Sequence, residues 1–288
     1  MDTDTNADAD ADADAVTRAP GDAFLLEGRL AGYSEAGTSR LPLPLAELQM
    51  HGTTTLAFKY GDGVVVAVDS RASVGSYVGS RTVKKAFPVG GRMVATMAGG
   101  AADCAHWIRR VARRAKMLEE DFGSTLPVVA VARLFARSLR EFKGSDLSIG
   151  TMVAGVDVQG RGGIGSGSGG MSMGRPALFY VDNACNCVPG ALFCVGSGAS
   201  LAYGVLDTAA PHGLQALPTL AAAVDVAVRA IRQATYRDAY SGGYINVLHI
   251  NSTGIHQLLR TDSRTLALPP VVGPSLPPSL PPASSSAA

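Results

Sequence analysis

Two pairs of helical patterns, each enclosed by blocks of strand patterns, constrain the fold of this chain more than any other feature. Runs of β-branched and aromatic residues predict strands at 53–60, 64–70, 93–97, 149–156, 177–181, 191–195, 244–250 and 254–258. Apolar spacing of three and four residues predicts helices at 101–120, 126–142, 200–207 and 219–240. This order predicts two sheets sandwiched by helices and argues against a β-α-β alternation with a parallel sheet.

The clearest local signals lie in the first strands and the first helix pair. Gly61-Asp-Gly63 is a tight-turn sequence between two apolar runs, which predicts a β-hairpin. In the first helix, Arg109, Arg110, Arg113 and Arg114 share one face, opposite Ile108, Val111, Ala115 and Leu118. This pattern indicates a face in contact with solvent or another subunit more than a nucleic-acid site. For the second helix, the predicted core face is Val129, Phe135, Leu139 and Phe142.

Composition excludes several other classes of protein. At 288 residues with 47% hydrophobic content, the chain has enough apolar material for a large core. No apolar run approaches the roughly 20 residues that a membrane-spanning helix needs. The acidic start differs from the basic and apolar start of a secretory signal, so we expect a reducing compartment. Residues 1–22 and the Pro- and Ser-rich tail are predicted to bury too little apolar surface to become ordered.

Two motifs that could suggest metal or nucleotide binding have simpler interpretations. The cysteines form neither a disulfide framework nor a zinc signature, so we expect buried or inert thiols. They are Cys104, Cys185, Cys187 and Cys194. Gly165, Gly167 and Gly170 spell G-x-G-x-x-G, but no predicted helix follows whose N-terminus could hold a phosphate. We therefore predict a flexible surface loop there, and no cofactor or metal.

The dipeptide Gly52–Thr53 divides the chain by charge and by chemistry. Residues 1–52 hold three Arg against seven Asp and three Glu, a net charge of −7, although the whole chain carries +1. Cleavage after Gly52 would give Thr53 both a hydroxyl nucleophile and a free α-amine as its base. Glycine before Thr53 allows the tight backbone conformation that attack on the preceding carbonyl requires. Strand alternation is expected to turn Thr54 away from Thr53 and Thr55. From these residues alone, an ordinary Thr-rich strand start remains open.

Six segments, in the same order along the chain, form a more specific pattern. They are Thr53-Thr-Thr-Leu-Ala-Phe-Lys-Tyr60, Val66-Ala-Val-Asp-Ser-Arg71, Thr82-Val-Lys-Lys85, Met97-Ala-Gly-Gly-Ala-Ala-Asp-Cys104, Gly196-Ser-Gly198 and Tyr236-Arg-Asp-Ala-Tyr-Ser-Gly-Gly243. Together they resemble the beta type-5 family of 20S proteasome subunits, which are N-terminal nucleophile hydrolases. The resemblance implies an α+β fold, a four-layer αββα sandwich of two mainly antiparallel sheets. It also implies a propeptide at 1–52, a catalytic domain at 53–260 with a Gly-rich insertion at about 160–174, and a Pro/Ser-rich disordered tail at 261–288.

The resemblance assigns the expected catalytic roles. Thr53 corresponds to the nucleophile, whose freed amine accepts the proton, and Asp69 and Lys85 to the ionic pair beside it. Gly99 corresponds to the oxyanion-hole position, where a backbone N–H stabilises developing negative charge. Ser197, Asp238 and Ser241 correspond to the supporting network around the nucleophile. Without the resemblance, Ser197 could equally be a loop hydroxyl and Asp238 a helix-end charge.

For substrate selection, the resemblance places Ala72, Met97 and Ala101 in the S1 pocket. A flexible apolar Met between small side chains suits a large hydrophobic residue before the scissile bond. Met97 could also be ordinary strand core, and both interpretations can hold. Ser73, Val74 and Phe87 depart from the family pattern, which affects the fine shape of the expected pocket.

The resemblance also implies the cellular setting of the chain. The expected activity is that of a threonine endopeptidase with chymotrypsin-like preference, autoprocessed at Gly52–Thr53, in ATP- and ubiquitin-dependent protein degradation. Expected partners are other alpha and beta subunits, in seven-membered beta rings between alpha rings, and unfolded protein or peptide substrates. No nucleic acid or membrane partner is expected, and the expected location is cytoplasm and nucleus. A non-catalytic structural beta subunit is the main alternative, and an amidase of the same hydrolase class is a more remote one.

Overall fold

The computed structural model describes residues 52–75, 77–145, 147–158 and 174–265. All described residues belong to one compact unit of the chain. The propeptide before Gly52, nearly all of the Gly-rich insertion and the tail from residue 266 lie outside the described residues. Their predicted organisation therefore stays a prediction.

The first sheet has five strands, in the order β11-β1-β2-β12-β13. Their bounds are β1 Thr55–Tyr60, β2 Gly63–Val68, β11 Leu192–Val195, β12 Tyr244–Asn251 and β13 Gly254–Asp262. Strands β1 and β2 pair in antiparallel register from Thr55↔Val68 to Tyr60↔Gly63, with a turn at Gly61 and Asp62. The predicted hairpin is thus confirmed, and β13 continues two residues beyond the predicted domain boundary at 260.

The second sheet has the order β10-β9-β8-β6-β5, and β7 also pairs with β8. Its strands are β5 Ala86–Gly90, β6 Met93–Thr96, β7 Ala98–Gly99, β8 Ile149–Asp157, β9 Arg175–Asp182 and β10 Cys187–Pro189. A small separate pair is formed by β3 Ala72–Val74 and β4 Tyr77–Ser80. Every strand pair in the described part of the chain is antiparallel, as the resemblance implies.

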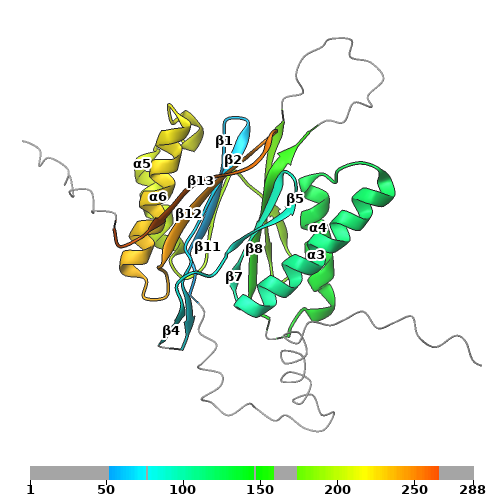
Figure 1. The fold of residues 1–288 in the computed structure, drawn as a ribbon, viewed down its shortest axis with the longest axis horizontal. Coiled ribbons are helices and arrows are strands. Elements are labelled where there is room, and N and C mark those ends of the chain that lie inside the picture. The colour runs from blue at the N-terminus through cyan, green and yellow to red at the C-terminus, as the bar shows by residue number, and fades with distance from the viewer. Residues whose placement is uncertain (1–51, 76, 146, 159–173, 266–288) are drawn as a thin grey trace, which may run out of the picture. The chain divides into compact units, whose positions relative to one another are not determined.

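Helices cover the outer face of each sheet, so the described unit has four layers (Figure 1). The helices are α3 Ala101–Phe122, α4 Val128–Leu139, α5 Ala199–Ala209 and α6 Leu220–Arg237, with short 3-10 turns η1 Arg140–Phe142 and η2 Leu214–Ala216. One core lies between α3, α4 and the second sheet, a second lies between α5, α6 and the first sheet, and a third fills the space between the sheets. The αββα sandwich is therefore confirmed.

The faces of the first helix pair agree with the prediction only in part. On α3 all four predicted surface arginines are exposed, and Ile108, Val111 and Ala115 are buried. On α4 the buried residues at positions 128, 131, 132, 135 and 139 form one stripe along the helix. Val129 lies about 100° around the helix axis from the centre of this stripe and is half-buried. Phe142 is 41% exposed in η1 and contacts the edge of Trp107. The predicted core positions Val129 and Phe142 were therefore wrong, because the helix ends at Leu139 and only its central stripe faces the sheet.

Several short strands had no sequence signal. The predictions omitted β3, β4, β5, β7 and β10, each of two to five residues. Strands this short are defined by their pairing more than by their own composition, and one of them, β7, pairs with a distant partner, Ala98 with Gly150. Among the described helices, none combines the length and the apolar character needed to cross a membrane.

Candidate active site

The residues around Gly52–Thr53 converge because three strand ends meet there. Thr53 lies two residues before β1, Asp69 directly follows β2, and Lys85 directly precedes β5. The antiparallel pairing of β1 with β2 continues past the hairpin strands, where the Asp69 N–H donates to the Thr54 carbonyl at 3.1 Å. Lys85 enters from the second sheet, so the cluster joins the two sheets at one edge.

A buried ion pair lies against the Thr53 hydroxyl. The Lys85 ammonium nitrogen is 2.6 Å from Asp69 Oδ1 and 3.0 Å from Thr53 Oγ1. The two charged side chains are 1% and 0% exposed. Removing two charges from water is costly unless each is paired and hydrogen-bonded, and both conditions are met here. The ion pair therefore holds a cation at a fixed place beside a hydroxyl nucleophile.

Backbone donors complete the surroundings of the Asp69 carboxylate. Its Oδ1 accepts from the Thr54 N–H at 3.0 Å, in addition to Lys85. Its Oδ2 accepts from the N–H of Gly242 at 2.9 Å and of Arg71 at 3.2 Å. Charge-assisted bonds of this kind fix a carboxylate in one orientation. Asp69 is thereby held in place by the strand ends and by the loop after α6.

Burial shifts the acid–base properties of both members of the pair. Burial raises the pKa of Asp69 above 3.8, opposed by the nearby Lys85 charge and by the donors from Lys85, Gly242 and Thr54. Burial lowers the pKa of Lys85 below 10.5, opposed by the charge and hydrogen bond of Asp69. A lysine whose pKa is lowered is more easily neutral near physiological pH, which suits proton transfer.

The Thr53 hydroxyl also contacts the peptide that joins it to Gly52. Thr53 Oγ1 donates to the Gly52 carbonyl oxygen at 2.7 Å, and Lys85 Nζ donates to the same oxygen at 3.4 Å. Gly52 is buried, and a Cβ at this position would collide with the side chain of Tyr240. Glycine is therefore required by close approach to the loop after α6, a reason that the sequence alone did not show.

A second polar network reaches the Thr53 amide from the other side. The Thr53 N–H donates to Ser197 Oγ at 3.2 Å, and Ser197 Oγ donates to Asp238 Oδ2 at 2.5 Å. Ser241 Oγ donates to the same Asp238 oxygen at 2.7 Å. Ser197 is exposed and Asp238 is half-buried, whereas Ser241 is buried. The structure thus brings together all three residues that were predicted as a supporting network.

Thr54 connects the two networks, and sequence reasoning missed it. Its N–H donates to Asp69, and its hydroxyl lies 2.7 Å from Ser241 Oγ in a fully buried position. Strand alternation was expected to turn Thr54 away from Thr53 and Thr55. Although β1 begins only at Thr55, the Thr54 hydroxyl does have a different partner, Ser241, from those of the Thr53 hydroxyl. The run of three threonines was a possible signal, since a hydroxyl beside the nucleophile is well placed to orient its partners.

Gly99 lies at the end of β7, immediately before the glycine that precedes α3. Its φ of +105° lies in a region that side chains disfavour, and a Cβ there would collide with the carbonyl of Ser148. A glycine is thus required here for backbone reasons. Its assignment as the oxyanion-hole donor stays a prediction.

The residues predicted for the S1 pocket have mixed surroundings. Ala72 is in β3, and Ala101 is the first residue of α3, and both are half-buried. Met97 is 3% exposed and belongs to the core between the second sheet and its helices. Its backbone N–H donates to the Lys85 carbonyl at 2.8 Å, which ties it directly to the ion pair. Met97 is a core residue, therefore, and its role in substrate selection stays a prediction.

Metal ligands and reactive thiols are not part of this cluster. In the described segments of the chain, no three His, Cys, Asp or Glu residues gather as a metal site. Cys104 and Cys194 are buried, and burial raises the pKa of each thiol to about 12. The prediction of buried or inert thiols is confirmed for these two, whereas Cys185 and Cys187 are half-buried.

Comparison with known proteins gives one consistent result. Residues 49–250 match the family model described as "Proteasome subunit". The chain is 44% identical over 218 residues to "Proteasome subunit beta type-5" of Gallus gallus, covering 76% of this chain and 77% of the relative. It is 41% identical over 212 residues to the protein of the same name in Dictyostelium discoideum, covering 74% and 71%. It is also 38% identical over 217 residues to "Proteasome subunit beta type-8" of Canis lupus familiaris, covering 75% and 72%.

Proposed function

The chain belongs to the proteasome subunit family, and from this premise we propose that it is a catalytic beta subunit of the 20S core. In this proposal it is a threonine endopeptidase that cleaves peptide bonds after large hydrophobic residues. It is made as a zymogen, and cleavage at Gly52–Thr53 produces the working enzyme. The observation that carries the proposal is the position of the Thr53 hydroxyl, between the Lys85 ammonium and the Gly52 carbonyl.

Maturation begins with attack of Thr53 Oγ1 on the Gly52 carbonyl carbon. The neutral form of Lys85, which burial favours by lowering the pKa of the amine, accepts the hydroxyl proton at Nζ, 3.0 Å from Thr53 Oγ1. A new C–O bond forms, and the C–N bond to Thr53 breaks as its nitrogen takes up a proton. The product is an ester, which water hydrolyses to release residues 1–52 with a free carboxylate on Gly52. Until the C–N bond breaks, the Thr53 nitrogen is acylated and cannot act as a base, and until the ester is hydrolysed the Thr53 oxygen is not free as the nucleophile.

In the mature enzyme, Thr53 supplies both nucleophile and base. An α-amine has a reference pKa of about 7.7–8.0, so a useful fraction is neutral at cellular pH. The contact of the Thr53 nitrogen with Ser197, and through it with Asp238, gives the new amine polar partners at once. Lys85 stabilises the developing alkoxide, and Asp69 compensates the Lys85 charge. The Gly99 N–H stabilises the oxyanion of the substrate, a contribution of about 3 kcal/mol in comparable enzymes.

The preference for large hydrophobic residues comes from the neighbourhood of Met97. Ala72 and Ala101 carry small side chains, and Met97 is a flexible apolar one in the same part of the fold. The Met97 backbone is hydrogen-bonded to that of Lys85. A substrate side chain bound against Met97 is therefore held at a fixed place relative to the nucleophile. Such binding energy is used for orientation of the scissile bond.

The proposal includes an assembly and a location. The family implies assembly with other proteasome subunits. We place the chain in a seven-membered beta ring between alpha rings, acting on unfolded proteins or peptides in ATP- and ubiquitin-dependent degradation, in cytoplasm and nucleus. Nucleic acid and membranes have no part in this function.

Intact mass spectrometry and N-terminal sequencing of the assembled particle test the proposal. The wild-type chain is expected to begin at Thr53, and a chain that still begins at Met1 contradicts the zymogen hypothesis. Thr53→Ala is expected to remain joined to Gly52 and to lack activity toward a peptide with a large apolar residue before the scissile bond. Thr55→Ser is the matched control, because its hydroxyl contacts only the Val195 carbonyl. Activity that survives Thr53→Ala contradicts the assigned nucleophile and leaves the non-catalytic subunit as the better interpretation.

A further inference from the structure

A cationic pocket with two free thiols lies far along the sequence from the active-site cluster, between α4 and the turn from β9 to β10. Its volume is about 440 Å³, and it is lined by Arg133, Ala136, Arg137, Arg140, Cys185 and Cys187. This volume is within the roughly 300–1,000 Å³ of small-molecule sites. Nothing in the proposed proteolytic mechanism uses these residues.

The charge of the pocket comes from one face of a helix. Arg133, Arg137 and Arg140 are exposed and spaced by four and three residues, which places them on one side of α4 and its extension. In the part of the chain that the structure describes, no carboxylate lies within ion-pair distance of these three guanidinium groups. The acidic side chain at the start of this turn, Asp182, accepts from the Asn186 N–H at 2.9 Å and from its side-chain amide at 2.8 Å, and its single charge does not balance three guanidinium groups. The pocket thus has a net positive charge that the described residues do not neutralise.

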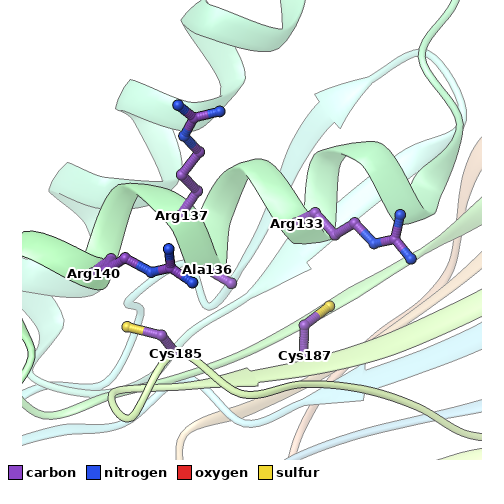
Figure 2. Close-up of a pocket in the computed structure, with 6 residues that line it drawn as sticks. All are labelled: Arg133, Ala136, Arg137, Arg140, Cys185 and Cys187. Carbon is purple, nitrogen blue, oxygen red and sulfur yellow. The ribbon is translucent and has the colours of Figure 1, made fainter.

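The two thiols face this charge from the opposite wall. Figure 2 shows Arg140 extending over Cys185 and Arg133 beside Cys187, whereas Arg137 points away from both sulfurs. Burial raises the pKa of the Cys187 thiol, and the charge of Arg133 partly opposes this effect.

Cys185 is held in an unusual backbone conformation. It has a φ of +67°, and it is the only non-glycine residue with positive φ in the described part of the chain. The turn is closed by the Cys185 N–H, which donates to the Asp182 carbonyl at 3.0 Å. A strained conformation in a residue other than glycine often accompanies a functional position. Here it presents the half-buried Cys185 side chain to the pocket.

From this arrangement we infer that the pocket is a modification site, at which Cys185 exchanges with small disulfides that carry carboxylates. Partially exposed thiols in electropositive surroundings are the ones that react, because nearby cations favour the thiolate. The Cys185 thiolate attacks one sulfur of the disulfide and forms a new S–S bond. The other half leaves as a thiolate and takes a proton from water, so the oxidant is the small disulfide itself. The guanidinium groups of Arg133 and Arg140 hold its carboxylates.

The test compares an anionic with a cationic disulfide on the assembled particle. Glutathione disulfide carries carboxylates and a net negative charge, whereas cystamine is positively charged. Peptide mapping by mass spectrometry measures the rate of mixed-disulfide formation at each cysteine. Cys185 is expected to be the main site of labelling. The rate ratio, which is the rate with the anionic disulfide divided by the rate with the cationic disulfide, is expected to be about tenfold higher for Cys185 than for a cysteine in a free peptide. Cys104 and Cys194 serve as internal controls because they are buried.

Arginine variants separate charge recognition from simple exposure. Arg133→Gln with Arg140→Gln is expected to bring the rate ratio close to that of the free peptide, whereas Arg113→Gln, an exposed arginine on α3, leaves it unchanged. Cys185→Ser is expected to abolish labelling at this turn and to leave peptide cleavage unchanged. Three results overturn the inference: no labelling of Cys185 in the particle, main labelling at Cys187, or a rate ratio that the double arginine variant does not alter.

Discussion

Two regions of this molecule place cations beside nucleophilic side chains, and they do so in opposite ways. At Thr53, the single cation Lys85 is buried and paired with Asp69 at 2.6 Å. Beside Cys185 and Cys187, Arg133 and Arg140 are exposed, and no carboxylate among the described residues forms an ion pair with them. A compensated buried charge acts on groups of the chain itself, because its field is weakly screened and its position is fixed. Uncompensated exposed charge is available to an external ligand, and salt weakens it.

The largest expected effect comes from removing the buried cation. Lys85→Ala is expected to stop processing and to lower the rate of peptide cleavage by about 10³-fold or more, because no other cation contacts the Thr53 hydroxyl among the described residues.

Asp69→Ala is expected to lower the free energy of unfolding by about 3–5 kcal/mol, because it leaves the Lys85 charge buried without its partner. N-terminal sequencing, peptide cleavage and denaturant unfolding of the particle measure these effects. A Lys85→Ala chain that still begins at Thr53 would contradict the assigned proton acceptor.

A smaller effect separates maturation from catalysis. Gly52→Ala is expected to slow processing by about 100-fold, because its Cβ would collide with Tyr240 and displace the scissile carbonyl. A chain produced already starting at Thr53 is expected to retain full activity, since Gly52 is absent from it. Time courses of propeptide release measure the first effect. Equal release rates for the variant and the wild type would show that the close approach to Tyr240 is unimportant.

Thr54 tests whether the two networks of the buried region act together. Thr54→Val removes the hydroxyl that contacts Ser241 and keeps the N–H that binds Asp69. We expect kcat to fall about tenfold with KM nearly unchanged, because the hydroxyl orients groups and does not touch the substrate. Thr54→Ser is expected to restore activity and the wild-type pH profile. If the variant changes only the stability, and neither kcat nor the pH profile, then Thr54 contributes to packing and does not position catalytic groups.

The pH dependence of processing reports on Lys85. A neutral amine must accept the Thr53 proton, and burial lowers the Lys85 pKa below 10.5. The rate of processing should therefore rise about tenfold per pH unit as long as most of the Lys85 amine is protonated. The rate should level off where the pH reaches the lowered pKa of Lys85. Pulse labelling of the precursor between neutral and alkaline pH measures this. A rate that only levels off at the pKa of a free lysine would contradict the role of burial.

The smallest expected effect is that of salt, which distinguishes the two regions directly. Raising ionic strength from about 0.01 to 0.15 M shortens the Debye length from about 30 to 8 Å. Labelling of Cys185 by the anionic disulfide should fall a few-fold, whereas peptide cleavage by a neutral substrate should stay constant. The rate of each reaction over a salt series measures the difference. Equal salt dependence in both regions would remove the distinction drawn between them.

The sequence predicted the layers for reasons that are local. Apolar periodicity marked the long strands and helices, and the hairpin followed from Gly61-Asp-Gly63, because turn chemistry and period are properties of short segments. The motif positions of Asp69 and Lys85 followed from the family resemblance, and the structure brings both to Thr53. The short strands β3, β4, β5, β7 and β10 were missed, because two to five residues are too few to show a clear period of two.

By itself, the sequence determined the order of elements, the family and the chemical nature of Gly52–Thr53. Only the tertiary structure decided how these residues cooperate. The collision that a side chain at Gly52 would meet comes from Tyr240, nearly 190 positions away in the numbering, and Thr54 bridges Asp69 to Ser241 across a similar separation. Cys185 and Cys187 differ from the buried Cys104 and Cys194 because they are half-buried and line a pocket together with α4, which only the tertiary structure shows. Such contacts depend on how strand ends and helices pack, and no short segment of sequence contains that information.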